Sequence, residues 1–458
     1  MKEHNMEHGS TRHAATALSS LAAALLAACG GGGDGGDGGG AVEPPVSSPV
    51  GCVALREEIS WYRDTLSSEW NDVVIDEQQH IWLAGWSNGV VGQTNIEPAG
   101  NSRAVVRQLD ADGTLLWDAG ARFDTPGADA AEALAIGRDG TVFVVGRTTG
   151  NLDGADNAGQ FDTFVAWAER PGLATPWRTF QIGTDRPQHP RRAAVDARGN
   201  LLIAGHDDEY VPTNYVEAWS DAFAMRLDRQ GAGTADDRLT AAWTHRSNSA
   251  EPDIGGGLAS LETADGAATF VSGAVQSGTQ RGMYLRRLDG LGQATWTTRY
   301  SAVPLDHVAV IRPLVGGDLL IGGSVYGSFP GAVGLGQQDV FVARVSAADG
   351  RVLRSWQLGS SGAEWLADLQ IDREGNIVLF GETTGSVVAG QPNAGGNDLF
   401  MMKIAGNDGR VLATRQWGTA DDERAGRVAL DQCGRAVAVG SSGDRYRRDA
   451  IAWYWRPS

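Results

Sequence analysis

The side chains best suited to chemistry gather around His206-Asp207-Asp208-Glu209. Three acids beside an imidazole could bind a divalent cation or act as an acid–base pair. Consecutive residues cannot all face one point, and acidic loops are usually only solvated, which is the interpretation we favour. The segment that enters this unit carries further polar residues, namely Asp185, Arg186, His189, Arg191 and Arg192. The candidate ligand face is therefore His189, Arg191, Arg192, His206, Asp207, Asp208 and Glu209.

Other chemical motifs are absent from the sequence. There is no G-x-S-x-G, H-E-x-x-H or P-loop, so we predict no catalytic residue. The five histidines after Cys29 share no metal-ligand spacing, so we predict no metal site and no cofactor. Calcium at the Asp- and Gly-rich loop 151–162 is a weaker alternative, because Asp162 also fits a recurring structural position.

A repeated unit must position these residues. A short apolar run that ends in glycine recurs seven times, 50 to 68 residues apart, as in LLIAG and IVLFG; the closing glycines are Gly85, Gly146, Gly205, Gly273, Gly323, Gly381 and Gly440. Each run reads as a buried strand. A glycine at every end indicates a bulge or sharp exit where a Cβ would clash.

The rest of the unit also recurs. Turns such as DARGN (196–200) and DREGN (372–376) precede the strand and predict hairpins. In four units a D-x-F pattern, as at Asp398, opens a third strand, and we expect its aspartate to cap or pin that strand. The fourth strand usually carries tryptophan; these are Trp117, Trp177, Trp243, Trp296, Trp356 and Trp417.

Four antiparallel strands repeated radially predict an all-β, seven-bladed β-propeller. The seventh unit lacks a fourth strand, whereas 59–67 is an orphan strand before the first unit. We expect this N-terminal strand to complete the last blade and close the ring, which would hide exposed sheet edges. The long Gly-rich loops, including 206–220 and 382–397, should then share one face.

The combination of D-x-x-G-N, a β run ending in glycine, T-T-G, a Gly-rich loop and D-x-F, best seen in DREGNIVLFGETTG and NDLF, resembles the SBBP family of seven-bladed β-propeller repeats. The resemblance covers about 59–458. It implies a bacterial envelope or secreted protein, and it carries no shared catalytic residues. The units containing NSRA and RGMY depart most from the pattern, because the D-x-F start is missing.

The N-terminus predicts export and lipidation. Residues 14–28 form an apolar run of signal-peptide length, and Leu26-Ala27-Ala28-Cys29 resembles a bacterial lipobox in which Cys29 accepts the lipid. The Gly-rich segment that follows cannot bury apolar surface and suits a flexible tether. We therefore divide the chain into a signal peptide at 1–28, a tether at 29–51 and one propeller at 52–458. The outer membrane is favoured over the inner one.

The acidic composition suits a soluble exported domain, and together with the tether and the absence of a catalytic motif it favours a binding role. The formal charge is −18, from 38 basic and 56 acidic residues, which argues against nucleic acid as a partner. The leading hypothesis is a monomeric, membrane-anchored binding or scaffold propeller for a protein or glycan. The first alternative is a polysaccharide hydrolase or lyase that uses Glu382, Arg147 or the acids of the third unit. The second is a quinoprotein-like assembly factor, suggested by LDADGTLLW at 109–117.

Cysteine usage predicts one disulfide. With Cys29 lipidated, Cys52 and Cys433 are the two cysteines that remain, and an exported domain meets an oxidising compartment. The predicted ring closure would bring Cys52 near the turn that holds Cys433. The bridge would then join the two ends of the repeat array.

Overall fold

The structure of the protein is a computed structural model. The structure describes residues 68–88, 102–120, 122–152, 154, 156–169, 176–208, 220–247, 253–263, 266–275, 282–301, 303, 306–443 and 448–455. All of these belong to one compact unit, Pro49–Ser458. Within these ranges we find no helix that could cross a membrane.

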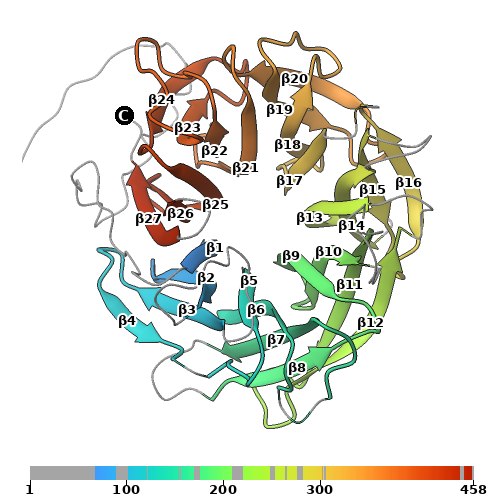
Figure 1. The fold of residues 1–458 in the computed structure, drawn as a ribbon. Coiled ribbons are helices and arrows are strands. Elements are labelled where there is room, and N and C mark those ends of the chain that lie inside the picture. Colours follow the sequence, from blue (N-terminus) through green and yellow to red (C-terminus); the bar gives the residue numbers. More distant parts are fainter. Residues whose placement is uncertain are drawn as a thin grey trace, which may run out of the picture. The chain divides into compact units, whose positions relative to one another are not determined.

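Seven antiparallel sheets stand around a central channel as the blades of a β-propeller (Figure 1). Blades one and two contain β1 (Ser68–Ile75), β2 (Ile81–Ser87), β3 (Arg103–Leu109), β4 (Leu115–Asp118), β5 (Asp129–Ile136), β6 (Thr141–Thr148), β7 (Asp162–Glu169) and β8 (Arg178–Ile182). Blades three and four contain β9 (Gln188–Val195), β10 (Leu201–Asp208), β11 (Ser220–Gln230), β12 (Arg238–Arg246), β13 (Asp253–Thr263), β14 (Gly266–Val275), β15 (Gly282–Leu288) and β16 (Ala294–Arg299).

Blades five to seven contain β17 (His307–Pro313), β18 (Leu319–Tyr326), β19 (Gln338–Val345), β20 (Val352–Leu358), β21 (Glu364–Ile371), β22 (Ile377–Thr383), β23 (Asp398–Ile404), β24 (Val411–Trp417), β25 (Asp422–Leu430), β26 (Ala436–Gly443) and β27 (Arg448–Trp455). The predicted all-β, seven-bladed architecture is confirmed. Strands β3 and β15 form even though their units lack the D-x-F start.

The seventh blade has three strands among the described residues, β25, β26 and β27. It adjoins the first blade directly: the Ala450 backbone N–H donates to Ser68 Oγ at 3.2 Å, and the Gln432 N–H donates to Gln79 Oε1 at 2.9 Å. The predicted closing strand at 59–67 lies outside the described residues, so its role stays a prediction.

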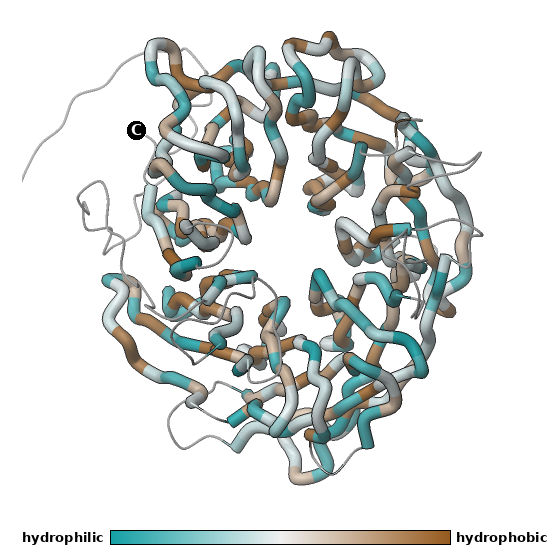
Figure 2. Tube along the Cα trace, in the orientation of Figure 1, coloured by the Kyte–Doolittle hydropathy of each residue, from teal (hydrophilic) through white to brown (hydrophobic). Residues whose placement is uncertain are grey.

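The hydrophobic core lies between neighbouring blades. The second strand of each blade is almost wholly buried, as in β2, β6 and β18. Its side chains pack against the next sheet; Val310 and Val342 of blade five, for example, join one cluster with Leu379 and Phe400 of blade six. Figure 2 shows these hydrophobic segments as brown stretches along the strands of the blades.

Glycine closes the second strand because the first strand bulges beside it. A Cβ added at each of the seven predicted glycines would lie 1.9–2.3 Å from a backbone carbonyl oxygen of the first strand of its own blade. The first-strand register shifts at the same level in all seven blades. The expected clash is confirmed, and the bulges turn first-strand residues toward the channel.

In three of the four D-x-F units the aspartate pins the loop before the third strand, as predicted, whereas Asp221 accepts from Arg186 Nη1 at 2.7 Å. In blade six the buried Asp398 accepts hydrogen bonds from the Ala394 N–H and, at 2.9 Å, from Gln416 Nε2 on the fourth strand. Gln416 Oε1 in turn accepts from the Val387 N–H at 2.9 Å. The same arrangement recurs at Asp162 with Gln181 and at Asp339 with Gln357. We call this aspartate–glutamine pair the loop latch.

Replacing Gln416 by alanine should lower the free energy of unfolding by about 2 kcal/mol, because Val387 N–H, Gly385 carbonyl and Asp398 would each lose a buried partner. Urea unfolding would measure the change. The matched control is Gln230→Ala, at an exposed glutamine, for which we expect about 0.5 kcal/mol or less. Equal effects of the two substitutions would contradict the latch.

Each outer-strand tryptophan lies on or beside the fourth strand, as expected, and several pack on the following blade. Trp356 Nε1 donates to the Asp408 carbonyl at 2.8 Å. A Cβ at Gly409 in that turn would fall 2.0 Å from the Trp356 ring, which explains a glycine there.

Cys433 lies half-buried in the turn between β25 and β26, where its N–H donates to Asp431 Oδ1 at 2.8 Å. Cys52 is outside the described residues, so the bridge stays a prediction. A non-reducing peptide map of exported protein should recover the 52–433 cross-link. Full alkylation of both thiols before reduction would argue against it.

Candidate functional site

The hairpin of β9 and β10 brings the two histidines of the candidate ligand face together. His189 pairs with His206 across the two strands, and their rings stack with centroids 5.1 Å apart. His189 Nε2 lies 3.0 Å from Asp208 Oδ2. One ring nitrogen of each histidine and one Asp208 oxygen lie within 4.8 Å of one another. We call His189, His206 and Asp208 the histidine cluster.

The histidine cluster is held from the neighbouring blade. Arg147 of β6 places Nη1 2.5 Å from His189 Nδ1 and its Nε 2.8 Å from Glu132 Oε1. Glu132, in the bulge of β5, also accepts from Asn71 Nδ2 at 3.1 Å. This chain of contacts runs across three blades, so His189 is fixed by the assembled ring and not only by its own hairpin.

The environment sets the charge of the histidine cluster. Burial, together with the nearby positive charge of Arg191, lowers the pKa of His206 to about 3, so this imidazole is neutral at pH 7. Burial opposes ionisation of Asp208, but the hydrogen bond from His189 and nearby positive charges hold its pKa below the ordinary value. A neutral imidazole beside a carboxylate is a combination that can ligate a metal.

Asp207 does not belong to this group. Its side chain is fully buried and points to the other side of the strand, where Arg246 Nε lies 2.8 Å from Oδ2 and Arg186 Nη1 lies 3.5 Å from Oδ1. Asp207 is therefore a structural ion-pair residue. Glu209 lies outside the described residues, as do Cys29 and Cys52, so the structure does not bear on their predicted roles.

Arg192 has a structural role that the sequence did not indicate. It reaches across the channel from β9, where its Nη2 donates to the carbonyls of Ala309 at 2.7 Å and Ala367 at 3.2 Å. Arg427 of β25 donates from Nη2 to the Arg191 carbonyl at 3.2 Å. We call Asp72, Asp368, Arg192, Arg312 and Arg427 the hub, because they join opposite blades across the channel.

Two aspartates, the buried Asp368 and the half-buried Asp72, balance the hub arginines. Asp368 Oδ1 accepts from Arg312 Nη2 at 2.8 Å, and Asp368 Oδ2 accepts from the Val428 N–H at 3.2 Å. Asp72 accepts in the same manner from the Leu134 N–H of the next blade at 2.7 Å. Both carboxylates thus fasten one inner strand to the next.

Asp72 should make stability depend on pH. Burial raises its pKa to about 6, although Arg427 and the Leu134 N–H oppose the shift. Since the folded protein holds this proton more tightly than the unfolded chain, with a pKa of about 4, the stabilising contribution is complete below pH ~4 and is lost as the pH rises through about 6. The urea midpoint of wild type, measured relative to that of Asp72→Asn, should therefore decrease as the pH is raised from about 4 to about 6. Parallel curves for the two proteins would contradict the assignment.

A cavity of about 250 Å³ opens at the channel mouth on the face where β10 and β22 end. It is lined by Arg191, Arg192, Gly255, Gly256, His307, Ala309, Trp365, Leu366, Ala367, Glu382, Ala425 and Arg427. Arg191 is exposed there, and Trp365 is half-buried. Burial raises the pKa of Glu382, which is held by the Ala425 N–H at 2.8 Å and Asn397 Nδ2 at 3.0 Å.

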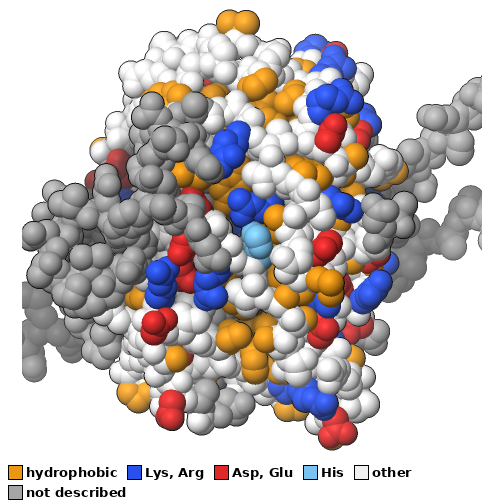
Figure 3. Space-filling view, turned by 90° about the vertical axis from the view of Figure 1, so that its right-hand side faces the viewer, with side chains coloured by type: hydrophobic (Ala, Val, Ile, Leu, Met, Phe, Trp, Pro, Cys, Tyr) orange, Lys and Arg blue, Asp and Glu red, His pale blue; other side chains and the backbone are white. Residues whose placement is uncertain are grey.

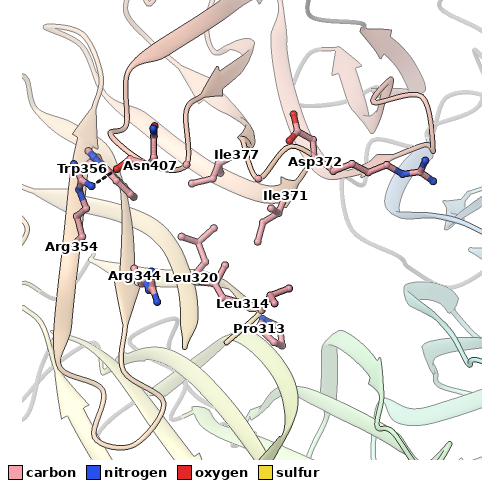
Figure 4. Close-up of a pocket in the computed structure, with 14 residues that line it drawn as sticks. Pro313, Leu314, Leu320, Arg344, Arg354, Trp356, Ile371, Asp372, Ile377 and Asn407 are labelled. Carbon is pink, nitrogen blue, oxygen red and sulfur yellow. Dashed lines mark hydrogen bonds between the residues drawn. The ribbon is translucent and has the colours of Figure 1, made fainter. Parts of the chain in front are cut away.

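A larger cavity, of about 700 Å³, lies between blades five and six among the hairpin turns (Figure 4). Its floor is apolar, with Leu320, Ile371 and Ile377. The arginines at its edge are already engaged: Arg344 Nε lies 2.7 Å from Asp318, and Arg354 donates to the Asn407 carbonyl. We place the candidate site at the channel mouth instead, because Arg191 is exposed there beside the half-buried Trp365.

Neither a protein-family model nor a curated protein matches the chain. Among solved structures, a protein of unknown function from Dyadobacter fermentans is 13% identical with a TM-score of 0.45, over 87% of this chain and 97% of that one. The β-propeller domain of the Trilobed protease from Pyrococcus furiosus, described as having an open velcro topology, is 8% identical with a TM-score of 0.44, over 86% and 96%. The polysaccharide lyase Uly1 is 10% identical with a TM-score of 0.42, over 90% and 95%. Likeness at this level carries no argument about function, and the architecture rests on the strand order.

Proposed function

We propose that this protein is a membrane-anchored, non-catalytic propeller that binds an acidic glycan of the cell envelope at the channel mouth. The observation that carries this proposal is the exposed Arg191, which lines one cavity together with Trp365 and the hub arginines Arg192 and Arg427, in a chain whose net charge is −18. Guanidinium groups recognise carboxylates, and a tryptophan face suits a sugar ring. The cavity is smaller than the ~300–1,000 Å³ of typical ligand pockets, which suits one protruding sugar residue.

The carboxylates around the mouth favour binding over hydrolysis. Glu382, Asp368 and Asp72 each accept backbone N–H groups of a neighbouring blade. An acid that holds the ring together in this way is poorly placed to move a proton on a substrate. Arg147, the other residue considered for an enzyme, is committed to Glu132 and His189.

One side of the propeller carries charges of both signs. Figure 3 shows one side of the molecule, where acidic and basic side chains are interspersed with apolar ones. No continuous basic stripe crosses the described residues in this view. The arginines that line the mouth would attract an acidic ligand to it.

Glycan binding can be tested by calorimetry with uronic-acid oligomers and with neutral glucose oligomers of equal length. We expect binding of the acidic oligomer only, weakened about tenfold by Arg191→Glu and by added salt. The matched control is Arg351→Glu, at an exposed arginine outside the cavity. Equal binding of both oligomers, or equal effects of both substitutions, would overturn the proposal.

The anchor is tested separately. Cys29→Ser should move the protein from the outer-membrane fraction to the soluble fraction. Unchanged fractionation would refute the anchor without bearing on glycan binding.

A further inference from the structure

The histidine cluster contains three side chains that could bind one transition-metal ion. Two imidazole nitrogens and one carboxylate oxygen are the donors that first-row transition metals take, whereas Ca²⁺ needs six or more oxygens. Tetrahedral Zn²⁺ with ligands near 2.0–2.1 Å separates its donor atoms by about 3.3 Å. Closing the observed spread of up to 4.8 Å would also require one imidazole to rotate, because the rings are stacked at 15° and their in-plane lone pairs run nearly parallel.

A second, independent observation points to a missing partner at this place. His206 is 9% exposed, and its Nδ1 is buried without a hydrogen-bond partner. An imidazole in a polar cluster normally uses both nitrogens, and an orphaned buried acceptor or donor costs about 1–3 kcal/mol. His189 stacks on this ring, and one ligand atom of each of the three side chains lies within 4.8 Å of the others, so an ion bound by His206 is within reach of His189 and Asp208.

We propose that His189, His206 and Asp208 bind one divalent transition-metal ion, of which Zn²⁺ is the model probe. The three protein ligands would leave at least one coordination position for water or an external ligand. This site rests on the geometry of β9 and β10 and does not depend on whether the channel mouth binds a glycan.

Arg147 regulates access to this site. Its Nη1 donates to His189 Nδ1, so His189 presents N–H from Nε2 to Asp208 in the structure. A metal ion bound to Nε2 of His189 requires the opposite tautomer, in which Nδ1 carries the proton. That proton would point at the Arg147 guanidinium, which is itself a donor. Metal binding must therefore break the contact between Arg147 and His189. Glutamine at position 147 could accept from Nδ1 and donate to Glu132, which would favour the metal-binding tautomer.

Titration of the metal-free full-length protein with Zn²⁺ tests the site, with Co²⁺ absorption as the reporter of tetrahedral coordination. Because other histidines and cysteines of the chain also bind metals, the readout is the difference between variants. We expect His206→Ala to bind one equivalent of Zn²⁺ fewer than wild type, or to bind that equivalent about 100-fold more weakly. Arg147→Gln should bind the same equivalent about tenfold more tightly. His245→Ala, at a half-buried histidine of β12 that contacts Arg286, is the matched control.

If His206→Ala does not fold, Asp208→Asn is titrated in its place. The same number of sites and the same affinity in wild type and in the folded variant would overturn the proposal. An equal loss of Ca²⁺ and Zn²⁺ binding in His206→Ala would also overturn it, because a site with two imidazoles and one carboxylate should discriminate against Ca²⁺.

Discussion

Replacing Asp368 by alanine is expected to lower the free energy of unfolding by about 4 kcal/mol, the typical range for removing one partner of a buried ion pair. Asp368 is 2% exposed and bonds Arg312 and the Val428 N–H, with Arg192 Nη1 3.9 Å away. Its loss would leave three hub arginines facing Asp72 alone. Equilibrium unfolding in urea, monitored by tryptophan fluorescence, would measure the change.

The control for Asp368 is Asp318→Ala. Asp318 also pairs with an arginine, Arg344, but the two side chains are 23% and 50% exposed, so we expect a loss of no more than about 1 kcal/mol. Asp368→Asn, which keeps the shape and removes the charge, should fall between the two. A loss below about 1 kcal/mol for Asp368→Ala would mean that the hub does not stabilise the ring.

Gly381→Ala should cost about 3 kcal/mol or more. The added Cβ would lie 2.1 Å from the Trp365 carbonyl oxygen and 2.9 Å from the buried Phe400 ring, so relief would require a shift in the bulge of β21. Thermal unfolding of wild type and variant would measure the loss.

Gly290→Ala is the matched control for Gly381, because the nearest atom to its added Cβ is 3.8 Å away. Its stability should stay within about 0.5 kcal/mol of wild type. If Gly381→Ala were as harmless, the glycine at the end of each second strand would need another explanation.

The repeat was predictable because each of its signals is local. The seven closing glycines, the hairpin turns and the role of Asp398 follow from a few neighbouring residues whose backbone demands are strong. The glutamine of the loop latch was missed, although Gln181, Gln357 and Gln416 stand at equivalent fourth-strand positions. The role of this glutamine becomes evident only from its hydrogen bond to the aspartate of the third strand, which the sequence does not show.

The histidine cluster shows where local reasoning ends. From the hairpin turn, the register pairs Val195 with Leu201 and would place His189 opposite Asp207. The bulge beside Gly205 moves the register by one residue and brings His189 opposite His206 instead. The glycine signalled the bulge, so the juxtaposition could have been found by applying the shift. The hub could not, since Arg192 meets Ala309 and Ala367 only after four blades are in place.

The hub also has a kinetic consequence. Within a blade, every strand pairs with its neighbour in sequence, and such short-range contacts form quickly. The hub contacts join residues 175 and 236 positions apart and must wait until most of the ring has assembled. Substitutions in the hub should therefore speed unfolding and leave the refolding rate nearly unchanged. The lifetime of the folded molecule is then set at its centre, by contacts that contribute little to how fast it forms.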